Sequence, residues 1–173
     1  MGLARPAQTN YMEYHKSSKV ILDLLKNNNF WFETFEHEPV RTSEEAAKIR
    51  PGYSLHQGAK TIIIRVKKSE KDKKFVMLVI PGDKRFDNEK VKRLFEAKDI
   101  RFATEEEVKQ ITEGVEPGGV PPFGNLFGIE VFADRTLFNN PKIIFNAGDR
   151  RLSVAMESKD YKKLVNPCIE TII

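Results

Sequence analysis

The chain of 173 residues and 19.9 kDa is long enough to bury one hydrophobic core without disulfides or metals to hold it together. Its hydrophobic content of 40% and charged content of 31% are those of an ordinary globular protein, and no apolar run reaches the length needed to cross a bilayer. The single cysteine, Cys168, excludes an internal disulfide, and the small number of histidines argues against a structural zinc site, so we expect no metal and no cofactor. The formal net charge of +4 slightly favours polyanionic partners.

Residues 1–14 show no hydrophobic periodicity, and we expect them to form a loosely held leader. Residues 1–10 lack the basic start and apolar stretch of a signal peptide, which favours a cytoplasmic location and argues against a membrane partner. Residues 15–173 contain no linker or internal repeat, so we predict that they form a single domain.

Hydrophobic periodicity and capping residues predict helices interspersed with short strands. The first helix is predicted to begin after Ser17 or Ser18 as its N-cap, because the apolar residues of 20–25 then share one face. Thr42 and Glu45 form a capping-box pattern at the start of the second helix. The remaining predicted elements are strands at 30–36, 59–66, 75–80, 100–103, 129–133, 142–146 and 152–157, and helices at 88–96, 104–114 and 158–165.

The strand at 59–66 has the strongest pattern, because its run Thr-Ile-Ile-Ile indicates burial on both faces. With the strand at 75–80 it predicts a hairpin whose charged tip, 67–74, is solvated. Several connections of hairpin length favour a mixed, mostly antiparallel sheet surrounded by helices. The predicted fold class is therefore α+β.

The stretch from Gly114 to Gly124 reads Gly-Val-Glu-Pro-Gly-Gly-Val-Pro-Pro-Phe-Gly and follows a predicted helix. Its glycines permit backbone conformations closed to other residues, whereas Pro117, Pro121 and Pro122 fix theirs. A stiff loop with bare backbone is suited to offer amide hydrogens to a ligand, although such clusters are also common as surface turns.

Three other places carry candidate functional groups, each with a structural alternative. Lys60 starts the buried strand, where its ammonium could neutralise a phosphate or an oxyanion, or could extend to solvent. His37 stands at a turn that would suit either a pocket rim or a bond to local backbone. The connection from Asn146 to Ser153 would suit either ligand contact or a polar hairpin turn. No nucleophile elbow or phosphate-binding glycine motif occurs, which favours chemistry without a strong side-chain nucleophile.

Four motifs occur in a fixed order along the chain. They are Glu-His-Glu-Pro-Val at 36–40 with Thr42 and Glu-Glu-Ala at 44–46, Gly-Ala-Lys-Thr at 58–61, the glycine and proline loop at 114–124, and Phe-Asn-Ala-Gly at 145–148 followed by Ser153. In this order they resemble the YbaK-like aminoacyl-tRNA deacylases, which are related to the editing domain inserted in bacterial prolyl-tRNA synthetases. The resemblance covers about Phe35 to Val165, and it implies the partly barrel-like fold of that family.

The resemblance implies that a free-standing domain hydrolyses the ester joining a wrong amino acid to tRNA. Lys60 matches the functional lysine of the family, and Gly118 and Gly119 belong to its Gly-x-x-x-Pro loop, so these three are the implied catalytic residues. The implied substrate-binding residues are His37, Thr61, Val120, Pro121, Pro122, Phe123, Asn146, Gly148 and Ser153. The implied partners are the acceptor end of aminoacyl-tRNA and, as a candidate, prolyl-tRNA synthetase, with no role for DNA.

This activity agrees with the residues present. An aminoacyl ester is already activated, so a catalyst can position water and stabilise the tetrahedral oxyanion with backbone amides and one cation. The family recruits a hydroxyl of the terminal ribose, which would account for the missing general base. Ser153 stands where some cysteine-directed members carry an acidic residue, so alanine, cysteine, serine or threonine on tRNA(Pro), or a nonprotein amino acid, all remain open.

Two rival hypotheses fit the same sequence. One is a noncatalytic module that binds tRNA or a synthetase through a basic surface that includes Arg150 and Arg151. The other is a hydrolase of small-molecule esters or amides. The first predicts tRNA affinity without turnover, and the second predicts activity on substrates that have no tRNA body. The favoured prediction is a deacylase that removes a small amino acid from tRNA(Pro).

Overall fold

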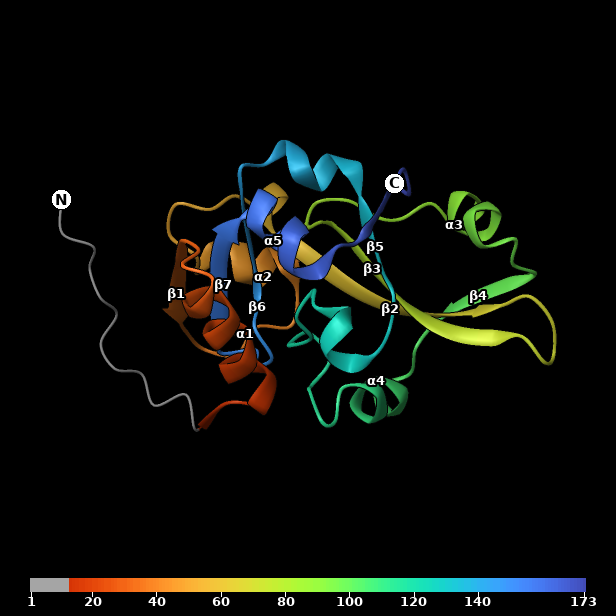
Figure 1. Ribbon diagram of the computed structural model, residues 1–173, viewed down its shortest axis with the longest axis horizontal. Coiled ribbons are helices and arrows are strands. Elements are labelled where there is room, and N and C mark those ends of the chain that lie inside the picture. The colour runs from red at the N-terminus through yellow and green to blue at the C-terminus, as the bar shows by residue number, and fades with distance from the viewer. Residues whose placement is uncertain (1–12) are drawn as a thin grey trace, which may run out of the picture.

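The computed structural model describes residues 13–173, and it contains two β-sheets with helices packed around them (Figure 1). A small sheet has the strand order β1-β7-β6, and a larger one has the order β4-β2-β3-β5-β8. The strands are β1 (Phe32–Glu36), β2 (Ala59–Lys67), β3 (Lys73–Pro81), β4 (Asp99–Phe102), β5 (Val131–Asp134), β6 (Lys142–Asn146), β7 (Leu152–Glu157) and β8 (Cys168–Glu170). The α-helices are α1 (Lys16–Asn27), α2 (Ser43–Lys48), α3 (Asn88–Phe95), α4 (Glu105–Ile111) and α5 (Ser158–Val165).

The small sheet brings together residues that are far apart in the sequence. It is antiparallel throughout, and its central strand β7 pairs Ser153 with Phe35 of β1 on one side and with Asn146 of β6 on the other. His37 immediately follows β1, and its backbone N–H donates to the carbonyl oxygen of Arg151 at 3.0 Å. This register places the first and the last of the sequence motifs side by side.

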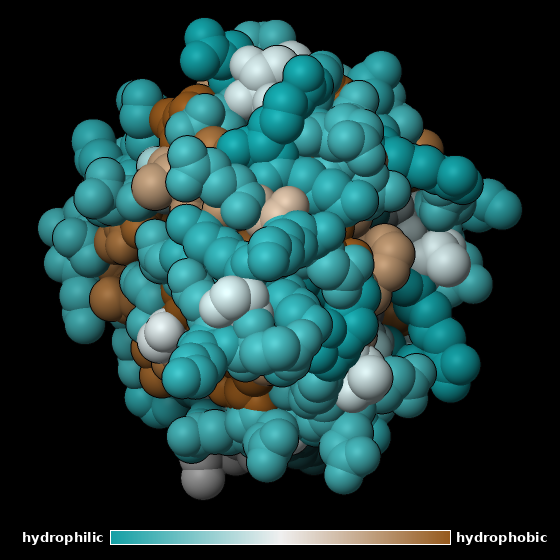
Figure 2. Space-filling model, turned by 90° about the vertical axis from the view of Figure 1, so that its right-hand side faces the viewer, coloured by the Kyte–Doolittle hydropathy of each residue, from teal (hydrophilic) through white to brown (hydrophobic). Residues whose placement is uncertain are grey.

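The larger sheet is built on the β2–β3 hairpin, which extends away from the small sheet toward β4 and α3 (Figure 1). β4 pairs with β2 only from Ile64 to Lys67, whereas β5 and β8 add parallel strands on the far side of β3. Residues Glu70 to Lys74 around the hairpin tip are exposed. Figure 2 looks at this end of the molecule and shows a mostly hydrophilic surface with separate apolar spots. The solvated tip is thus observed as predicted.

One hydrophobic cluster joins the two sheets. It includes Ile63 and Met77 of the larger sheet, Phe145 and Val154 of the small sheet, and Ile21 of α1, all of them buried. Full burial of such a side chain contributes about 1.5–3 kcal/mol relative to exposure. A second cluster packs α3 against the opposite face of the larger sheet. The shared cluster supports our proposal that residues 15–173 form a single domain.

The predicted α+β class with mostly antiparallel pairing is confirmed, although residues 13–173 form no closed barrel. The first helix cap was predicted wrongly, because His15 is the N-cap and its ring accepts from the backbone N–H of Ser17. Ser18 lies inside the helix and donates to the carbonyl oxygen of Ala147 at 2.5 Å. Strand β8 was missed because Pro167 indicated only the end of a helix.

Of the predicted leader, residues 1–12 lie outside the described residues. No helix within 13–173 is long and apolar enough to cross a membrane.

Candidate functional site

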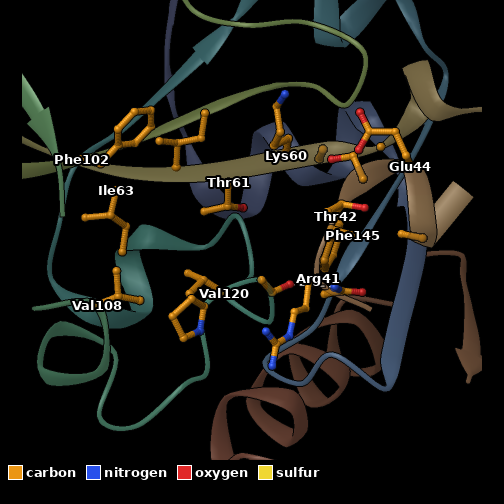
Figure 3. Close-up of a pocket in the computed structure, with 18 of the residues that line it drawn as sticks. Arg41, Thr42, Glu44, Lys60, Thr61, Ile63, Phe102, Val108, Val120 and Phe145 are labelled. Atoms are coloured by element: carbon orange, nitrogen blue, oxygen red, sulfur yellow. Dashed lines mark hydrogen bonds between the residues drawn. The ribbon is translucent and has the colours of Figure 1, made fainter. Parts of the chain in front are cut away.

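A cavity of about 420 Å³ lies where β2, α2, the loop after α4 and the end of β6 meet (Figure 3). Polar and apolar side chains share its wall. The lining residues include Arg41, Arg50, Lys60, Thr61, Ile63, Phe102, Val108, Gly118, Val120 and Asn146. The volume is within the range of pockets that bind small molecules or the end of a larger one.

Across residues 13–173, the edge of β2 that borders this cavity is unpaired in its middle, between the bridge from Gly58 to Ile144 of β6 and the residues that pair with β4. The carbonyl oxygen of Ile63 accepts from the N–H of Ala103 at 2.9 Å, and β4 pairs with β2 only between Ile64 and Lys67. Backbone groups of alternate residues point to the same edge of a strand. The backbone N–H and C=O of Thr61 therefore face the cavity edge, where β4 does not reach.

The Thr61 side chain adds a third polar group at this position. Its hydroxyl oxygen is buried and has no hydrogen-bond partner among residues 13–173. In Figure 3 the side chain lies on the same side of β2 as Val120, near the apolar side chains of Ile63 and Val108. A buried hydroxyl without a partner costs about 1–3 kcal/mol. Less than 1 Å² of this oxygen is accessible, so a ligand that bonds to Thr61 must displace the atoms that cover the oxygen, and it would then recover this cost.

Lys60 lies on the opposite side of β2 from Thr61 (Figure 3). Its ammonium donates to the carbonyl oxygen of Lys84 in the turn that follows β3. Burial lowers the pKa of the Lys60 amine, and the nearby charge of Arg85 lowers it further, while Glu44 acts in the opposite direction. The structure therefore places this cation at the rim of the cavity rather than beside the Thr61 hydroxyl.

A second cation, which the sequence analysis did not single out, is buried in the cavity wall. Only 7% of Arg50 is exposed, and its guanidinium donates from Nε to Ser153 Oγ and from Nη2 to Asn146 Oδ1, both at 2.9 Å. Within the described part of the chain, it forms no ion pair with a carboxylate. Burial accordingly lowers the pKa of Arg50 to about 10.

His37 and Ser153 form a hydrogen-bonded pair next to Arg50. His37 Nδ1 lies 2.8 Å from the carbonyl oxygen of Glu38, which can only accept, so Nδ1 carries the proton and Nε2 accepts from Ser153 Oγ at 2.7 Å. Burial lowers the pKa of His37 and favours this neutral form. The pair resembles a nucleophile with its base, but Ser153 is fully buried and accepts from Arg50. Ser153 therefore orients Arg50 and does not reach the cavity.

The glycine loop is tied to this network through Asn146. The Asn146 side-chain amide donates to the carbonyl oxygen of Gly118 at 2.7 Å, and the N–H of Gly148 donates to that of Gly119 at 2.9 Å. Gly118 has φ of +90°, and a Cβ there would lie 3.2 Å from the carbonyl oxygen of Arg41, so both conformation and space require glycine.

The backbone amides of the loop differ in their availability. The N–H of Gly119 donates to the carbonyl oxygen of Glu116 at 2.9 Å and closes a turn. Within residues 13–173, the N–H groups of Gly118 and Val120 have no hydrogen-bond acceptor. Among the loop residues that line the cavity, Gly118 and Val120 therefore have available amide donors, whereas the N–H of the predicted donor Gly119 is already engaged.

Three predicted substrate-binding residues form the buried part of the loop and do not line the cavity. Pro121, Pro122 and Phe123 are buried. The carbonyl oxygen of Pro122 accepts from the Tyr161 hydroxyl at 2.6 Å, and Phe123 packs edge-on against the ring of Tyr161. These residues anchor the loop to the hydrophobic core. Gly148 is also buried, because it packs against Ser17 and Ser18 of α1.

The structure thus brings five of the twelve predicted site residues to one cavity. Thr61, Val120, Gly118 and Asn146 line one cavity, with Lys60 at its rim. His37 and Ser153 support it through Arg50. Arg50 and Phe102 were not predicted from the sequence, because neither lies in a motif or in a recognisable local pattern.

Comparison with known proteins identifies the family. Residues 37–164 match the model of the aminoacyl-tRNA editing domain. The chain belongs to the aminoacyl-tRNA editing domain family. Membership confirms the predicted resemblance and the predicted class of enzyme, an aminoacyl-tRNA deacylase that hydrolyses an ester bond.

The relatives of this editing domain differ in their sequence identity to it and in the share of their own length that matches it. The multifunctional Ser/Thr-tRNA deacylase ProXp-y of Escherichia coli K12 is 29% identical over 148 residues, which are 85% of this chain and 87% of the relative. The proline–tRNA ligase of Bacillus licheniformis is 40% identical over 99 residues, but these are only 16% of the ligase. A solved structure proposed as a trans-editing enzyme for prolyl-tRNA synthetase superposes with a TM-score of 0.74 at 25% identity, over 91% of this chain and 97% of that one.

Proposed function

We propose that this editing domain removes a small amino acid with a side-chain hydroxyl, serine or threonine, from tRNA(Pro). The observation that carries the proposal is the buried, unpartnered hydroxyl of Thr61 at the free edge of β2. The name of the Escherichia coli relative supports serine and threonine, and the similarity to parts of proline–tRNA ligases supports tRNA(Pro).

Recognition of the amino acid follows from the surroundings of Thr61. A substrate hydroxyl can both donate to and accept from the Thr61 hydroxyl, whereas an alanine side chain would leave it unpaired. A site that is built to hydrogen-bond a substrate hydroxyl discriminates strongly against analogues that lack it. Ile63, Val108 and Val120 provide apolar surface for the methyl group that distinguishes threonine from serine.

The reaction requires no covalent intermediate with the enzyme. A water oxygen attacks the ester carbonyl carbon, the bond to the ribose oxygen breaks, and this oxygen leaves with a proton while the amino acid leaves as a carboxylic acid. The Gly118 and Val120 amides are the donors we assign to the developing oxyanion. We assign Lys60 to the tRNA side of the ester, where its charge meets the ribose and phosphate.

The buried Arg50 organises these donors in our proposal. It holds Asn146 through a charge-assisted hydrogen bond, and Asn146 in turn holds the carbonyl oxygen of Gly118. Loops positioned in this way keep a reacting group in an attacking geometry, and a misplacement of about 1 Å can cost roughly a hundredfold in rate. Arg50 therefore acts as a positioning residue through the loop.

The test compares release of serine and of alanine from the same tRNA(Pro) by the wild type, Thr61→Val and Thr61→Ser. Valine has the shape of threonine without its hydroxyl, so Thr61→Val should lower the kcat/KM for seryl-tRNA by about 5- to 150-fold, the equivalent of 1–3 kcal/mol, and should leave alanyl-tRNA nearly unchanged. Thr61→Ser keeps the hydroxyl and should retain the preference for serine.

Equal losses on both substrates would show that Thr61 has no part in recognising the hydroxyl. A wild type that binds tRNA but hydrolyses none of the esters would instead favour a noncatalytic binding module.

A further inference from the structure

Phe102 is exposed at the rim of the cavity. It ends the edge strand β4, and 63% of it is accessible to solvent, whereas the large apolar side chains of the described residues are mostly buried. Its ring contacts that of Phe86 edge-on, with centroids 5.7 Å apart and an angle of 64° between the planes. An exposed aromatic residue on an edge strand favours unwanted association between molecules. Its presence beside a pocket therefore indicates that it contacts a ligand.

Phe102 shares a face of the sheet with Lys60. Its register partner on β2 is Ile64, and directly opposed residues of an antiparallel pair lie on the same face, together with every second residue along each strand. Figure 3 shows Phe102 and Lys60 on one side of β2 and Thr61 on the other. One side of the cavity is therefore formed by Thr61, where we place the amino acid. The other side is formed by the aromatic ring of Phe102 and the cation of Lys60.

The charges beside Phe102 suit a nucleotide. Lys84 and Arg85 are exposed in the turn that also carries Phe86, and the ammonium of Lys60 contacts the carbonyl oxygen of Lys84. Asp83, in the same turn, is paired with the His56 ring at 2.8 Å. The turn therefore presents two cations next to an aromatic surface, a combination that recurs in proteins that bind single-stranded nucleic acid.

We propose that Phe102, backed by Phe86, stacks on the terminal adenine base at the 3′ end of the tRNA, with Lys84 and Arg85 facing the adjoining phosphate. The inference rests on the proposed function, because an ester held between Thr61 and Lys60 places its ribose at the rim. The base is attached to that same ribose, so it must lie within one nucleotide of the ester. Among residues 13–173, Phe102 is the exposed aromatic residue that lines the cavity there.

Binding is measured with tRNA(Pro) that carries serine through a nonhydrolysable amide link, so that the result does not depend on turnover. Stacking of one base on an aromatic ring is worth roughly 5- to 150-fold in affinity, so Phe102→Ala should weaken binding by a factor in this range. Phe102→Leu is the matched control, because it keeps apolar surface but has no ring. It should weaken binding as Phe102→Ala does, whereas Phe102→Trp should bind as well as the wild type.

A second substrate identifies the base. When the terminal adenine is replaced by an abasic ribose with the same amide-linked serine, the wild type should lose as much affinity as Phe102→Ala loses with intact tRNA. Phe102→Ala should lose no more on the abasic substrate. Independent, multiplying losses, or a Phe102→Leu variant that binds as tightly as the wild type, would overturn the proposal.

The two proposals fail in different ways. Binding that depends on Phe102 without hydrolysis of any ester would refute the proposed function and leave the stacking intact. Hydrolysis of seryl-tRNA with equal affinity in all Phe102 variants would refute the stacking alone.

Discussion

Replacing Arg50 with methionine separates its effect on catalysis from its effect on stability. Methionine keeps an unbranched apolar chain of similar length but has neither the charge nor the donors. The variant therefore loses the hydrogen bonds to Ser153 and Asn146 while the hydrogen bond from Ser153 to His37 can persist. The position of the Gly118 carbonyl group is then set by an Asn146 side chain that Arg50 no longer holds in place.

Two opposing terms set the change in the free energy of unfolding. Burial that lowers the pKa of Arg50 to about 10 corresponds to a cost of about 3 kcal/mol for keeping the cation in the folded protein, and methionine removes this cost. Each hydrogen bond from a charged donor contributes about 1.5–3 kcal/mol, and methionine loses both. The lost hydrogen bonds exceed the removed cost by about 0–3 kcal/mol, so we expect Arg50→Met to be destabilised by at most about 3 kcal/mol.

The substitution should lower kcat for deacylation strongly even where the free energy of unfolding changes little. Because a displaced loop misplaces its amide donors, we expect kcat for deacylation to decrease by about 10- to 100-fold with the protein still folded. Urea unfolding gives the stability, and single-turnover deacylation of seryl-tRNA gives the rate per folded molecule. Arg50→Lys keeps the charge but not the two-pronged donor geometry, and should recover only part of the rate. A folded Arg50→Met protein with the full rate would refute the positioning role.

Two further predictions concern Lys60 and the partly buried histidines His15 and His37. Lys60→Ala should lower deacylation at least a hundredfold with little change in melting temperature, because its half-buried amine makes one hydrogen bond, to Lys84; full activity in the variant would remove Lys60 from the mechanism. Burial lowers the pKa of His37 and of His15 below the ordinary 6.5, so the unfolded chain takes up protons first as the pH falls, and the free energy of unfolding should decrease from pH 7 to pH 5. Urea titrations should show a smaller decrease for His37→Asn, and an unchanged one would contradict the assignment.

Local sequence signals predicted those parts of the fold that depend on neighbouring residues. The cap at Thr42, which accepts from the N–H of Glu45, and the hairpin with its charged tip follow from spacing within a few positions. The glycine loop was also predicted as the exit of a helix, since α4 ends just before Gly114.

Contacts between distant residues explain what the sequence did not reveal. Arg50 bonds to side chains about 100 positions away, and no local pattern distinguishes it from an exposed arginine at a helix end. The prediction of Ser18 as a helix cap was wrong for the same reason, because the Ser18 hydroxyl donates to the carbonyl oxygen of the distant residue Ala147. Strand alternation implies that Lys60 and Thr61 point to opposite faces, but only the packing of the two sheets decides which face closes over a cavity.

The most direct test of the central claim is deacylation of tRNA(Pro) carrying serine, threonine, alanine, cysteine or proline by the wild-type protein. We expect rapid release of serine and threonine, slower release of alanine, and intact prolyl-tRNA, because the hydroxyls of serine and threonine can satisfy the buried Thr61 hydroxyl and the side chains of alanine and proline cannot. Release of alanine as fast as serine, or hydrolysis of prolyl-tRNA at a comparable rate, would contradict it.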